Sequence, residues 1–390
     1  MSPDQHPDEP LPSTTAARDT QDRSAFVAAV AALGGPQQTV GALAMAVDAS
    51  PTGAVPSRVA RVERGRALVL VIGCPSRPVP VEPVGDLAVG QWCVVTGLRD
   101  GGPGTVEAAM PRRTALVRHA AGARSTAQVL AADVDIVALT AAVDRRVPAR
   151  LIERLLALVW DSGARPVIVL TKTDLVDSGT VASVRREVAE LALGVDVLAV
   201  SARTGASADE IAALVPAGST LALLGSSGAG KSSLANLMLS GGIPAPDPGR
   251  PGRPGLLRTG QVRDADARGR HTTTWRELVG VPGGGALVDT PGLRSVGMWT
   301  SGDGVDTVFS DVVQLVASCR FADCRHDSEP GCAVTAAVDA GQLSPARLAG
   351  WRALQREATW AASRNDARLR SEIRQQWKQR SRDARHRSRP

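Results

Sequence analysis

The chain has 390 residues, of which 43% are hydrophobic and 22% are charged, and its formal net charge is +6. This length and composition predict a soluble protein with two or three domains. The sequence holds no apolar run near the roughly 18 residues of a membrane span, and its start lacks the layout of a signal peptide, so we expect neither membrane insertion nor export. Five cysteines are too few for a disulfide framework, which favours a reducing cytoplasm.

The beginning of the chain predicts a tail followed by a small barrel. Residues 1–35 are expected to form a disordered acidic tail, because most of them are polar or proline and show no periodicity. From 36 to 116, short β-type runs such as 57–62, 67–72 and 91–95 alternate with Gly, Pro and Asp. Strands at this spacing predict a β-barrel. An OB-fold is favoured because the segment is short, although periodicity alone does not separate it from an SH3-like barrel.

Residues 117–300 alternate between strand and helix patterns. Apolar strands are predicted at 134–143, 166–170, 195–200, 220–224 and 286–289, and helices at 151–160, 181–193 and 233–239. Near-continuous apolar strands separated by helices predict an α/β domain with a mostly parallel sheet covered on both faces.

Two further regions follow this domain. Residues 301–345 contain three of the five cysteines, and residues 346–390 form an Arg-rich extension with helical spacing of apolar residues to about position 379. Residues 351–390 alone hold twelve Arg or Lys against four Asp or Glu, which leaves a charge of +8. A basic segment beside a near-neutral body indicates an arm for a polyanion such as nucleic acid. The alternative is a solvated helix end that only aids solubility.

The strongest local signal is a phosphate-binding loop that directly follows the predicted strand 220–224 and fits the pattern G-x-x-x-x-G-K-[ST]. Its glycines let backbone N–H groups converge on phosphate oxygens, its lysine reaches the terminal phosphates, and its final serine can ligate Mg²⁺. The predicted phosphate-binding residues are Gly225, Ser226, Ser227, Gly228, Ala229, Gly230, Lys231, Ser232 and Ser233.

A second element, at the ends of two successive predicted strands, indicates GTP rather than ATP. The predicted guanine-binding residues are Thr171, Lys172, Asp174, Ser201 and Ala202. A carboxylate can accept hydrogen bonds from both N1–H and the exocyclic amine of guanine, which adenine cannot offer, so Asp174 is the predicted specificity residue. The stem of Lys172 can lie over the base, and the N–H of Ala202 can donate to guanine O6.

Further residues are candidates for the γ-phosphate and for Mg²⁺. Asp289 ends a predicted strand and is suited to hold Mg²⁺ through water, together with Ser232. The N–H of Gly292 can contact the γ-phosphate. A threonine from the polar loop between the two motifs, with Thr272 and Thr273 as the candidates, can complete the Mg²⁺ shell.

The order of these elements is that of a circularly permuted GTPase, because the guanine-binding residues precede the phosphate loop. With a β-barrel before the domain and a Cys/His segment behind it, the chain resembles the ribosome small subunit-dependent GTPase A family (RsgA, also called YjeQ) over about residues 36–335. The resemblance implies an OB-fold that contacts RNA, a permuted GTPase domain and a zinc-binding C-terminal domain. It also implies GTP hydrolysis that is stimulated by the small ribosomal subunit during its late maturation.

Two positions depart from common GTPase patterns. Thr171 stands where the pattern has Asn, and we expect this difference to weaken a loop-bracing contact more than guanine selection. Leu293 stands where many GTPases place a glutamine that orients water. The resemblance implies a catalytic histidine in the switch loop, and His271 matches that position. Without the resemblance, a structural role for this lone histidine is the simpler interpretation.

The cysteine cluster predicts one structural Zn²⁺ per chain. Cys319, Cys324, His326 and Cys332 offer three thiolates and one imidazole, which suits a closed tetrahedral site without zinc catalysis. The alternative is a set of buried, unligated cysteines beside an exposed histidine.

These observations predict a cytoplasmic, monomeric GTP hydrolase that uses Mg²⁺, and the resemblance implies that it acts on the small ribosomal subunit and its rRNA. One alternative is a GTP-switched RNA-binding module whose hydrolysis is incidental. A P-loop ATPase or metabolite kinase is the other alternative, and Asp174 with Ser201-Ala202 argues against it.

Overall fold

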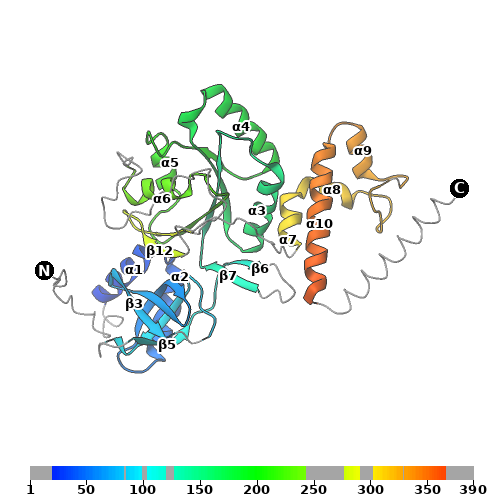
Figure 1. Ribbon diagram of the computed structural model, residues 1–390. Helices are drawn as coiled ribbons and strands as arrows, with labels where there is room; N and C mark the ends of the chain where they lie inside the picture. The colour runs from blue at the N-terminus through cyan, green and yellow to red at the C-terminus, as the bar shows by residue number, and fades with distance from the viewer. Residues whose placement is uncertain are drawn as a thin grey trace. The chain divides into compact units, whose positions relative to one another are not determined.

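A computed structural model of the protein describes residues 20–82, 85–98, 103–119, 127–242, 276–289, 302–327 and 329–365. The described residues divide into two compact units, the first drawn from 1–147, 162–190 and 194–296 and the second from 148–161, 191–193 and 297–390. Figure 1 shows their elements in chain order, from the barrel through the sheet to the C-terminal helices.

The first unit begins with a closed five-stranded barrel. Its strands are β1 (Val55–Glu63), β2 (Arg66–Val71), β3 (Cys74–Glu82), β4 (Trp92–Thr96) and β5 (Gly104–Ala109). They are hydrogen-bonded in the order β1-β2-β3-β5-β4 and close by pairing β4 with β1. The β3–β5 pair is parallel and the others are antiparallel. The inward-facing side chains, among them Val59, Val69 and Val95, form its core. This order confirms the predicted OB-fold.

Two helices precede the barrel where the sequence predicted a disordered tail. They are α1 (Thr20–Ala32) and α2 (Gln37–Asp48). The prediction of disorder to residue 35 is wrong from Thr20 onward, because α1 and the turn after it bury Val30 and Leu33 completely or nearly so. The stretch is Ala-rich, so its helical periodicity is weak, while alanine itself favours helix.

The first unit also contains a six-stranded sheet. Its strands are β8 (Ile136–Ala142), β9 (Arg165–Thr171), β10 (Val197–Ala199), β11 (Thr220–Gly225), β12 (Glu277–Gly280) and β13 (Ala286–Asp289). They lie in the order β10-β9-β8-β11-β13-β12, and only the edge strand β12 is antiparallel to its neighbour. A separate antiparallel pair, β6 (Ala115–His119) and β7 (Ala127–Ala132), leads into β8.

Helices α4 (Ser178–Leu191), α5 (Ala208–Ala212) and α6 (Lys231–Leu239) connect the strands, with a 3₁₀ turn at Thr173–Leu175. Apolar residues of α5 and α6 pack on one face of the sheet, where Ile211, Leu234 and Leu237 contact residues of β8, β9 and β11. Every residue of β8 and β11 is buried, as the continuous apolar runs predicted. From β8 the chain continues to β9, and from β11 it continues to β12 and β13, which lie in the opposite direction along the strand order, so the loops at the carboxyl ends of β8 and β11 border a topological switch point.

The second unit is helical. Its helices are α3 (Ala149–Asp161), α7 (Asp303–Val308), α8 (Ser310–Ala317), α9 (Ala333–Asp339) and α10 (Pro345–Asn365). α10 begins where the sequence predicted, whereas the rest of the predicted helical run lies outside the described residues.

A buried arginine joins four parts of this second unit. Arg347 of α10 donates to Glu153 of α3 (3.4 Å), to both carboxylate oxygens of Asp311 (3.0 and 3.1 Å) and to the carbonyl oxygens of Leu191 (3.0 Å) and Val308 (2.6 Å). Arg347 and Glu153 are 6% and 4% exposed, so the pair is removed from water. Burial raises the pKa of Glu153, and the charge of Arg347 opposes that rise.

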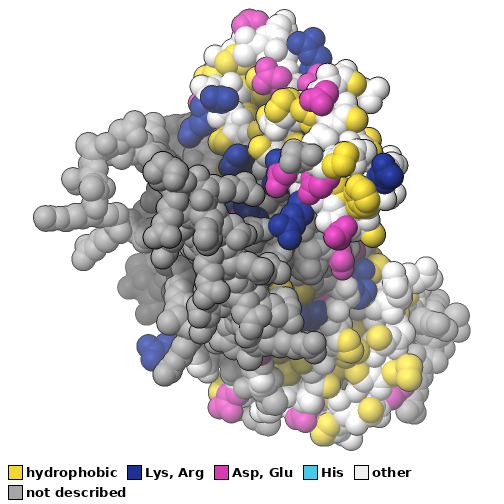
Figure 2. Space-filling model, turned by 90° about the vertical axis from the view of Figure 1, so that its right-hand side faces the viewer, with side chains coloured by type: hydrophobic (Ala, Val, Ile, Leu, Met, Phe, Trp, Pro, Cys, Tyr) yellow, Lys and Arg dark blue, Asp and Glu magenta, His cyan; other side chains and the backbone are white. Residues whose placement is uncertain are grey.

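Acidic and basic side chains are interspersed on the described part of the face that Figure 2 shows. Most of the predicted basic extension falls at 366–390, outside the described residues. Among the described helices, none combines the length and the apolar character that a membrane crossing needs.

Candidate nucleotide-binding site and metal centre

The phosphate loop connects β11 to α6, and its glycines are required by the backbone. Gly225 has φ of +154°, and a Cβ there would lie 2.3 Å from Thr140 Oγ1 on β8. Gly228 and Gly230 have φ of +75° and +83°, in the left-handed region that favours glycine. A Cβ on Gly230 would also approach Thr171 Oγ1 to 3.0 Å. The loop therefore has the close-packed backbone expected of a phosphate cradle, with α6 beginning at its end.

Lys231 lies inside this loop rather than on the surface. Its side chain is buried, and Nζ donates to the carbonyl oxygens of Gly225 and Ser226, both at 2.9 Å. Burial lowers the pKa of Lys231, and the charge of Asp289 at the end of β13 opposes this effect. Burial raises the pKa of Asp289, which Lys231 in turn opposes. The two groups thus interact electrostatically, and the charges of phosphate and Mg²⁺ would complement Lys231 and Asp289 respectively.

Thr171, at the end of β9, braces the phosphate loop. Its hydroxyl donates to the carbonyl oxygen of Ala229 at 2.8 Å, and the side chain is buried. Threonine therefore makes a loop-bracing contact at the position where the common pattern has asparagine. The next residue, Lys172, has a left-handed backbone with φ of +61°, which is unusual outside glycine and occurs often at functional sites.

Asp174 is held from both sides at the end of β9. Ser201 Oγ donates to Asp174 Oδ1 and Arg203 Nε donates to Asp174 Oδ2, each at 2.6 Å. Burial acts to raise the pKa of Asp174, but these hydrogen bonds outweigh it and hold the pKa below its usual value. The carboxylate is therefore ionised at neutral pH and oriented by its partners, as a guanine acceptor must be.

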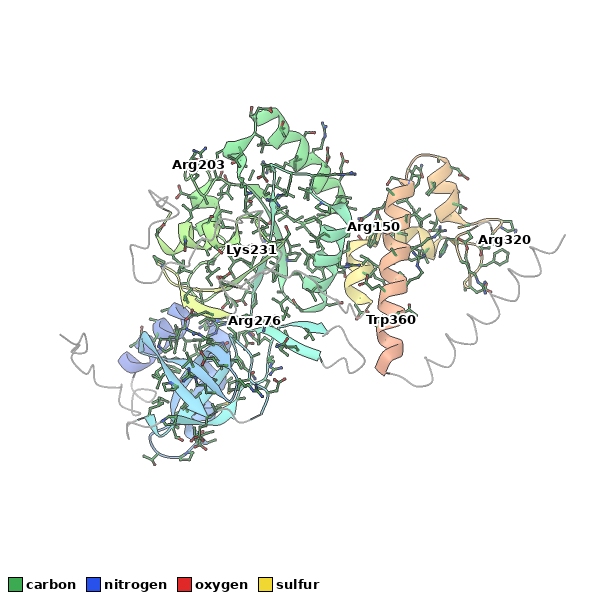
Figure 3. The ribbon with its side chains drawn as sticks, in the orientation of Figure 1. Arg150, Arg203, Lys231, Arg276, Arg320 and Trp360 are labelled. Atoms are coloured by element: carbon green, nitrogen blue, oxygen red, sulfur yellow. The ribbon has the colours of Figure 1, made fainter. Side chains whose placement is uncertain are left out.

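Sequence reasoning did not assign Arg203 a role. Figure 3 shows its side chain among those of the same unit as Lys231. Its place directly after Ser201-Ala202 was the available signal, because a charge beside the predicted guanine-binding segment can reach the carboxylate of Asp174.

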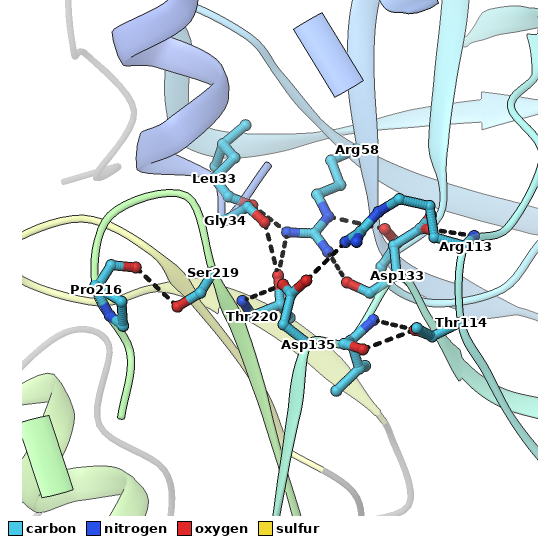
Figure 4. Close-up of polar contacts among 12 residues, drawn as sticks. Leu33, Gly34, Arg58, Arg113, Thr114, Asp133, Asp135, Pro216, Ser219 and Thr220 are labelled. Carbon is cyan, nitrogen blue, oxygen red and sulfur yellow. Dashed lines mark hydrogen bonds and ion pairs between the residues drawn. The ribbon is translucent and has the colours of Figure 1, made fainter. Parts of the chain in front are cut away.

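The strand that carries the phosphate loop is fixed to the barrel at its other end. Arg58 of β1 is fully buried and donates to Gly90 O (2.8 Å), Asp133 O (2.9 Å), Thr220 Oγ1 (2.8 Å) and the carbonyl oxygen of Leu33. Thr220 is the first residue of β11. Figure 4 shows this guanidinium surrounded by its acceptors. Burial lowers the pKa of Arg58 to about 10, so it stays charged at neutral pH.

Some predicted site residues cannot be placed. His271, Thr272, Thr273 and Gly292 lie outside the described residues. Their roles in catalysis, Mg²⁺ binding and γ-phosphate binding stay predictions, and so does the interpretation of Leu293.

The second unit brings the four predicted zinc ligands together. The ligand atoms of Cys319, Cys324, His326 and Cys332 all lie within 4.8 Å of one another. His326 Nδ1 is 3.5 Å from Cys319 Sγ and 3.6 Å from Cys332 Sγ, and the two sulfur atoms are 3.9 Å apart. A tetrahedron with Zn–S bonds of about 2.3 Å places sulfur atoms about 3.8 Å apart, so the geometry fits one structural Zn²⁺.

Surrounding contacts orient these ligands. Burial acts to raise the pKa of Cys332, but hydrogen bonds, first those from Thr335, lower it to about 6. The indole ring of Trp351 meets the His326 ring edge-on at 5.7 Å between centroids, and Arg352 donates to the His326 carbonyl oxygen. A thiolate and a fixed imidazole are the forms that bind zinc, so Cys332 and His326 fit as zinc donors.

Residues 109–299 match the family model described as RsgA GTPase. A Streptomyces coelicolor protein named small ribosomal subunit biogenesis GTPase RsgA is 46% identical over 336 residues, which cover 84% of this chain and 87% of that protein. RsgA 1 of Oceanobacillus iheyensis is 37% identical over 292 residues, or 75% and 79% of the two chains.

Two solved structures share the fold. YjeQ from Thermotoga maritima matches with a TM-score of 0.57 and 24% identity over 78% of this chain and 98% of that chain. YloQ, described as a circularly permuted GTPase, matches with a TM-score of 0.54, again at 24% identity, over 78% and 95%.

Proposed function

Because this chain belongs to the RsgA GTPase family, we propose that it hydrolyses GTP under the control of the small ribosomal subunit and acts in the late maturation of that subunit. The observation that carries the choice of nucleotide is Asp174, an ionised carboxylate held by Ser201 and Arg203 at the end of β9. Its sheet also presents the phosphate loop at the end of β11. The names of the relatives support the ribosomal partner.

The predicted site residues that the structure describes each have a role in this proposal. Asp174 accepts from guanine, Lys172 covers the base plane, and Ala202 donates to guanine O6. The phosphate loop binds the phosphates through its N–H groups, and Lys231 neutralises the terminal ones. Ser232 and Asp289 would hold Mg²⁺, which neutralises charge on the phosphate oxygens when it is bound.

We propose that His271 orients the water that attacks the γ-phosphate. The residue after Asp-x-x-Gly is Leu293, whose side chain has no group that can orient water. In the sequence, His271 stands between the phosphate loop and Asp289, where a switch residue of a GTPase is expected. The binding of RNA is assigned to the barrel, since OB-folds bind oligonucleotides on their strand faces and loops. We further propose a cytoplasmic monomer.

The test is turnover of GTP and of ATP by the full chain, with and without purified small subunits, at two salt concentrations. We expect GTP-selective turnover that rises with subunits and falls with salt, because contacts to RNA phosphates release counterions. A turnover rate that does not change when subunits are added, together with tight GTP-dependent RNA binding, would favour a nucleotide-switched RNA-binding module. Equal turnover of ATP would contradict the guanine assignment.

The variant His271→Ala tests the water assignment in the same assay. It is expected to lose subunit-stimulated turnover, by about a hundredfold or more, while GTP binding is unchanged. Preserved stimulation would show that another group orients the water.

A further inference from the structure

The loop after β8 borders the nucleotide site, yet none of the recognised motifs includes it. β8 lies between β11, which carries the phosphate loop, and β9, which carries the guanine-binding residues. The backbone N–H of Val143 donates to the carbonyl oxygen of Thr171 at 3.1 Å. This hydrogen bond brings the two residues that follow, Asp144 and Arg145, beside both motifs at the switch point of the sheet.

Asp144 contacts the lysine that is expected to cover the guanine base. Asp144 Oδ2 is 2.8 Å from Lys172 Nζ, which is hydrogen-bonding distance for an ion pair. The two side chains are 25% and 29% exposed, whereas the surface pair Asp196–Arg165 is 66% and 52% exposed. The Asp144–Lys172 pair is therefore the less screened by water. The left-handed backbone of Lys172 further restricts where its side chain can go.

The other oxygen of the same carboxylate faces an arginine that reaches the phosphate loop. Arg145 Nε is 3.4 Å from Asp144 Oδ1, and Arg145 Nη2 is 3.4 Å from the carbonyl oxygen of Gly228. Burial acts to raise the pKa of Asp144, but the hydrogen bonds and charges of Lys172 and Arg145 outweigh it and leave the pKa below its usual value. One ionised carboxylate thus connects the base-covering lysine with the loop that surrounds the phosphates.

We propose that Asp144 is a positioning residue for the guanine nucleotide, which holds Lys172 over the base and Arg145 against the phosphate loop at Gly228. The inference rests on the proposed function, because it assumes a guanine nucleotide in this site. Asp144 itself touches neither base nor phosphate in this arrangement. Its contribution is to restrict two long cationic side chains, so that less conformational freedom is lost when the nucleotide binds.

The experiment measures release of a fluorescent GDP analogue from the full chain by stopped flow. Asp144→Asn is expected to release GDP about fivefold faster, because the uncharged amide holds Lys172 less tightly. At saturating GTP the intrinsic kcat should stay within twofold while KM rises. Asp144→Glu, which restores the charge, should recover most of the affinity. Asp196→Asn, which breaks a surface ion pair away from the site, is the matched control and should change release by less than twofold.

A double-mutant cycle tests whether Asp144 acts through Lys172. In the Lys172→Met background, Asp144→Asn should change GDP release by less than twofold, because the lysine that it positions is gone. An equal effect in both backgrounds, or no effect in either, would overturn the proposal. Thermal unfolding without nucleotide, equal for Asp144→Asn and Asp196→Asn, checks that the fold is intact, and Arg145→Gln offers a second variant if it is not.

The failure of this inference is distinguishable from the failure of the proposed function. If the unaltered chain does not prefer GDP over ADP, the guanine site itself is wrong. If it prefers GDP and Asp144→Asn behaves like Asp196→Asn, only the positioning role of Asp144 is wrong.

Discussion

At the scale of single residues, the nucleotide site depends on a few side chains that contact one another across strand ends. Thr171 shows why the residue type is not enough to judge a contact. A threonine in place of asparagine was expected to weaken the bracing of the phosphate loop, yet its hydroxyl reaches the Ala229 carbonyl at 2.8 Å. Ala229 lies in the loop after β11 and Thr171 ends β9, with β8 between the two strands, so it is the path of the loop that brings the carbonyl oxygen within reach of a short side chain.

The first prediction concerns Asp174. Replacing it with asparagine puts an amide donor where guanine presents its own N–H donors, and it also removes the charge that Arg203 pairs with. We expect the affinity for GDP to fall by about 2–3 kcal/mol, roughly 30- to 150-fold, with loss of the preference over ADP. Competition against a fluorescent nucleotide measures both.

The matched control for this change is Asp177→Asn. Asp177 lies three residues further along the same loop and accepts from the N–H (2.9 Å) and hydroxyl (2.7 Å) of Thr180. It should leave GDP affinity unchanged. A retained preference for GDP in Asp174→Asn would remove Asp174 from the specificity role.

At the scale of elements, two polar centres connect the parts of the helical unit. The first is Arg347, whose guanidinium connects α10 to α3, α7 and α8. The second is the Cys/His cluster, which closes the segment between α8 and α9.

We predict that Arg347→Met destabilises the protein by about 3–5 kcal/mol, because it leaves the buried Glu153 carboxylate and the carbonyl oxygens of Leu191 and Val308 without this donor. Denaturant unfolding measures the loss. Arg165→Met, which breaks the exposed pair with Asp196, is the control and should cost less than about 1 kcal/mol. Equal stability of the two variants would mean that the buried arginine contributes nothing specific.

Zinc removal is the second prediction at this scale. Purified protein should contain one Zn²⁺ per chain, and a strong chelator should remove it and lower the unfolding temperature, since structural zinc contributes to folding directly. Cys332→Ser should abolish zinc binding, whereas Cys93→Ala, which alters a buried cysteine of the barrel, should retain it. Metal analysis of both variants checks this, and zinc retained in Cys332→Ser would contradict the ligand set.

At the scale of the whole first unit, Arg58 connects barrel and sheet. Its guanidinium donates hydrogen bonds to the carbonyl oxygens of three residues. Its Cζ also lies 4.6 Å from the centroid of the Trp92 ring. Nearby, Asp135 accepts from Arg113 and from the N–H of Thr220, both at 2.8 Å, which adds a second connection to the start of β11. The strand with the phosphate loop at one end is therefore anchored to the barrel at its other end (Figure 4).

Arg58→Met is expected to destabilise this unit by about 3 kcal/mol or more, because at least three buried carbonyl oxygens lose their donor. It should also increase proteolysis between the barrel and the sheet. Arg66→Met, on the neighbouring barrel strand with its side chain 62% exposed, is the control and should unfold like the unaltered chain. Limited proteolysis with denaturant unfolding distinguishes the two, and an unchanged Arg58→Met would contradict the anchoring role.

Much of this protein follows from the sequence alone. The alternation of apolar strands with helices predicted the parallel sheet, the β-type runs predicted the barrel, and the Cys/His spacing predicted the metal cluster, because each depends on local periodicity or ligand chemistry. The order of the motifs identified the permuted GTPase and the family. The placement of His271 and of the Mg²⁺ threonines stays a prediction.

Other features were decided only by tertiary structure. The sequence of α1 has weak helical periodicity, and the helix is stabilised by the burial of Val30 and of Leu33, which directly follows it. Arg58 and Arg347 look like ordinary surface arginines in the sequence, since nothing local marks a charge whose acceptors come from segments up to 194 residues away. The same holds for Asp144, which meets Lys172 only because β8 and β9 are neighbours in the sheet. Local pattern determines the elements and the motifs, whereas long-range packing decides which charged groups meet.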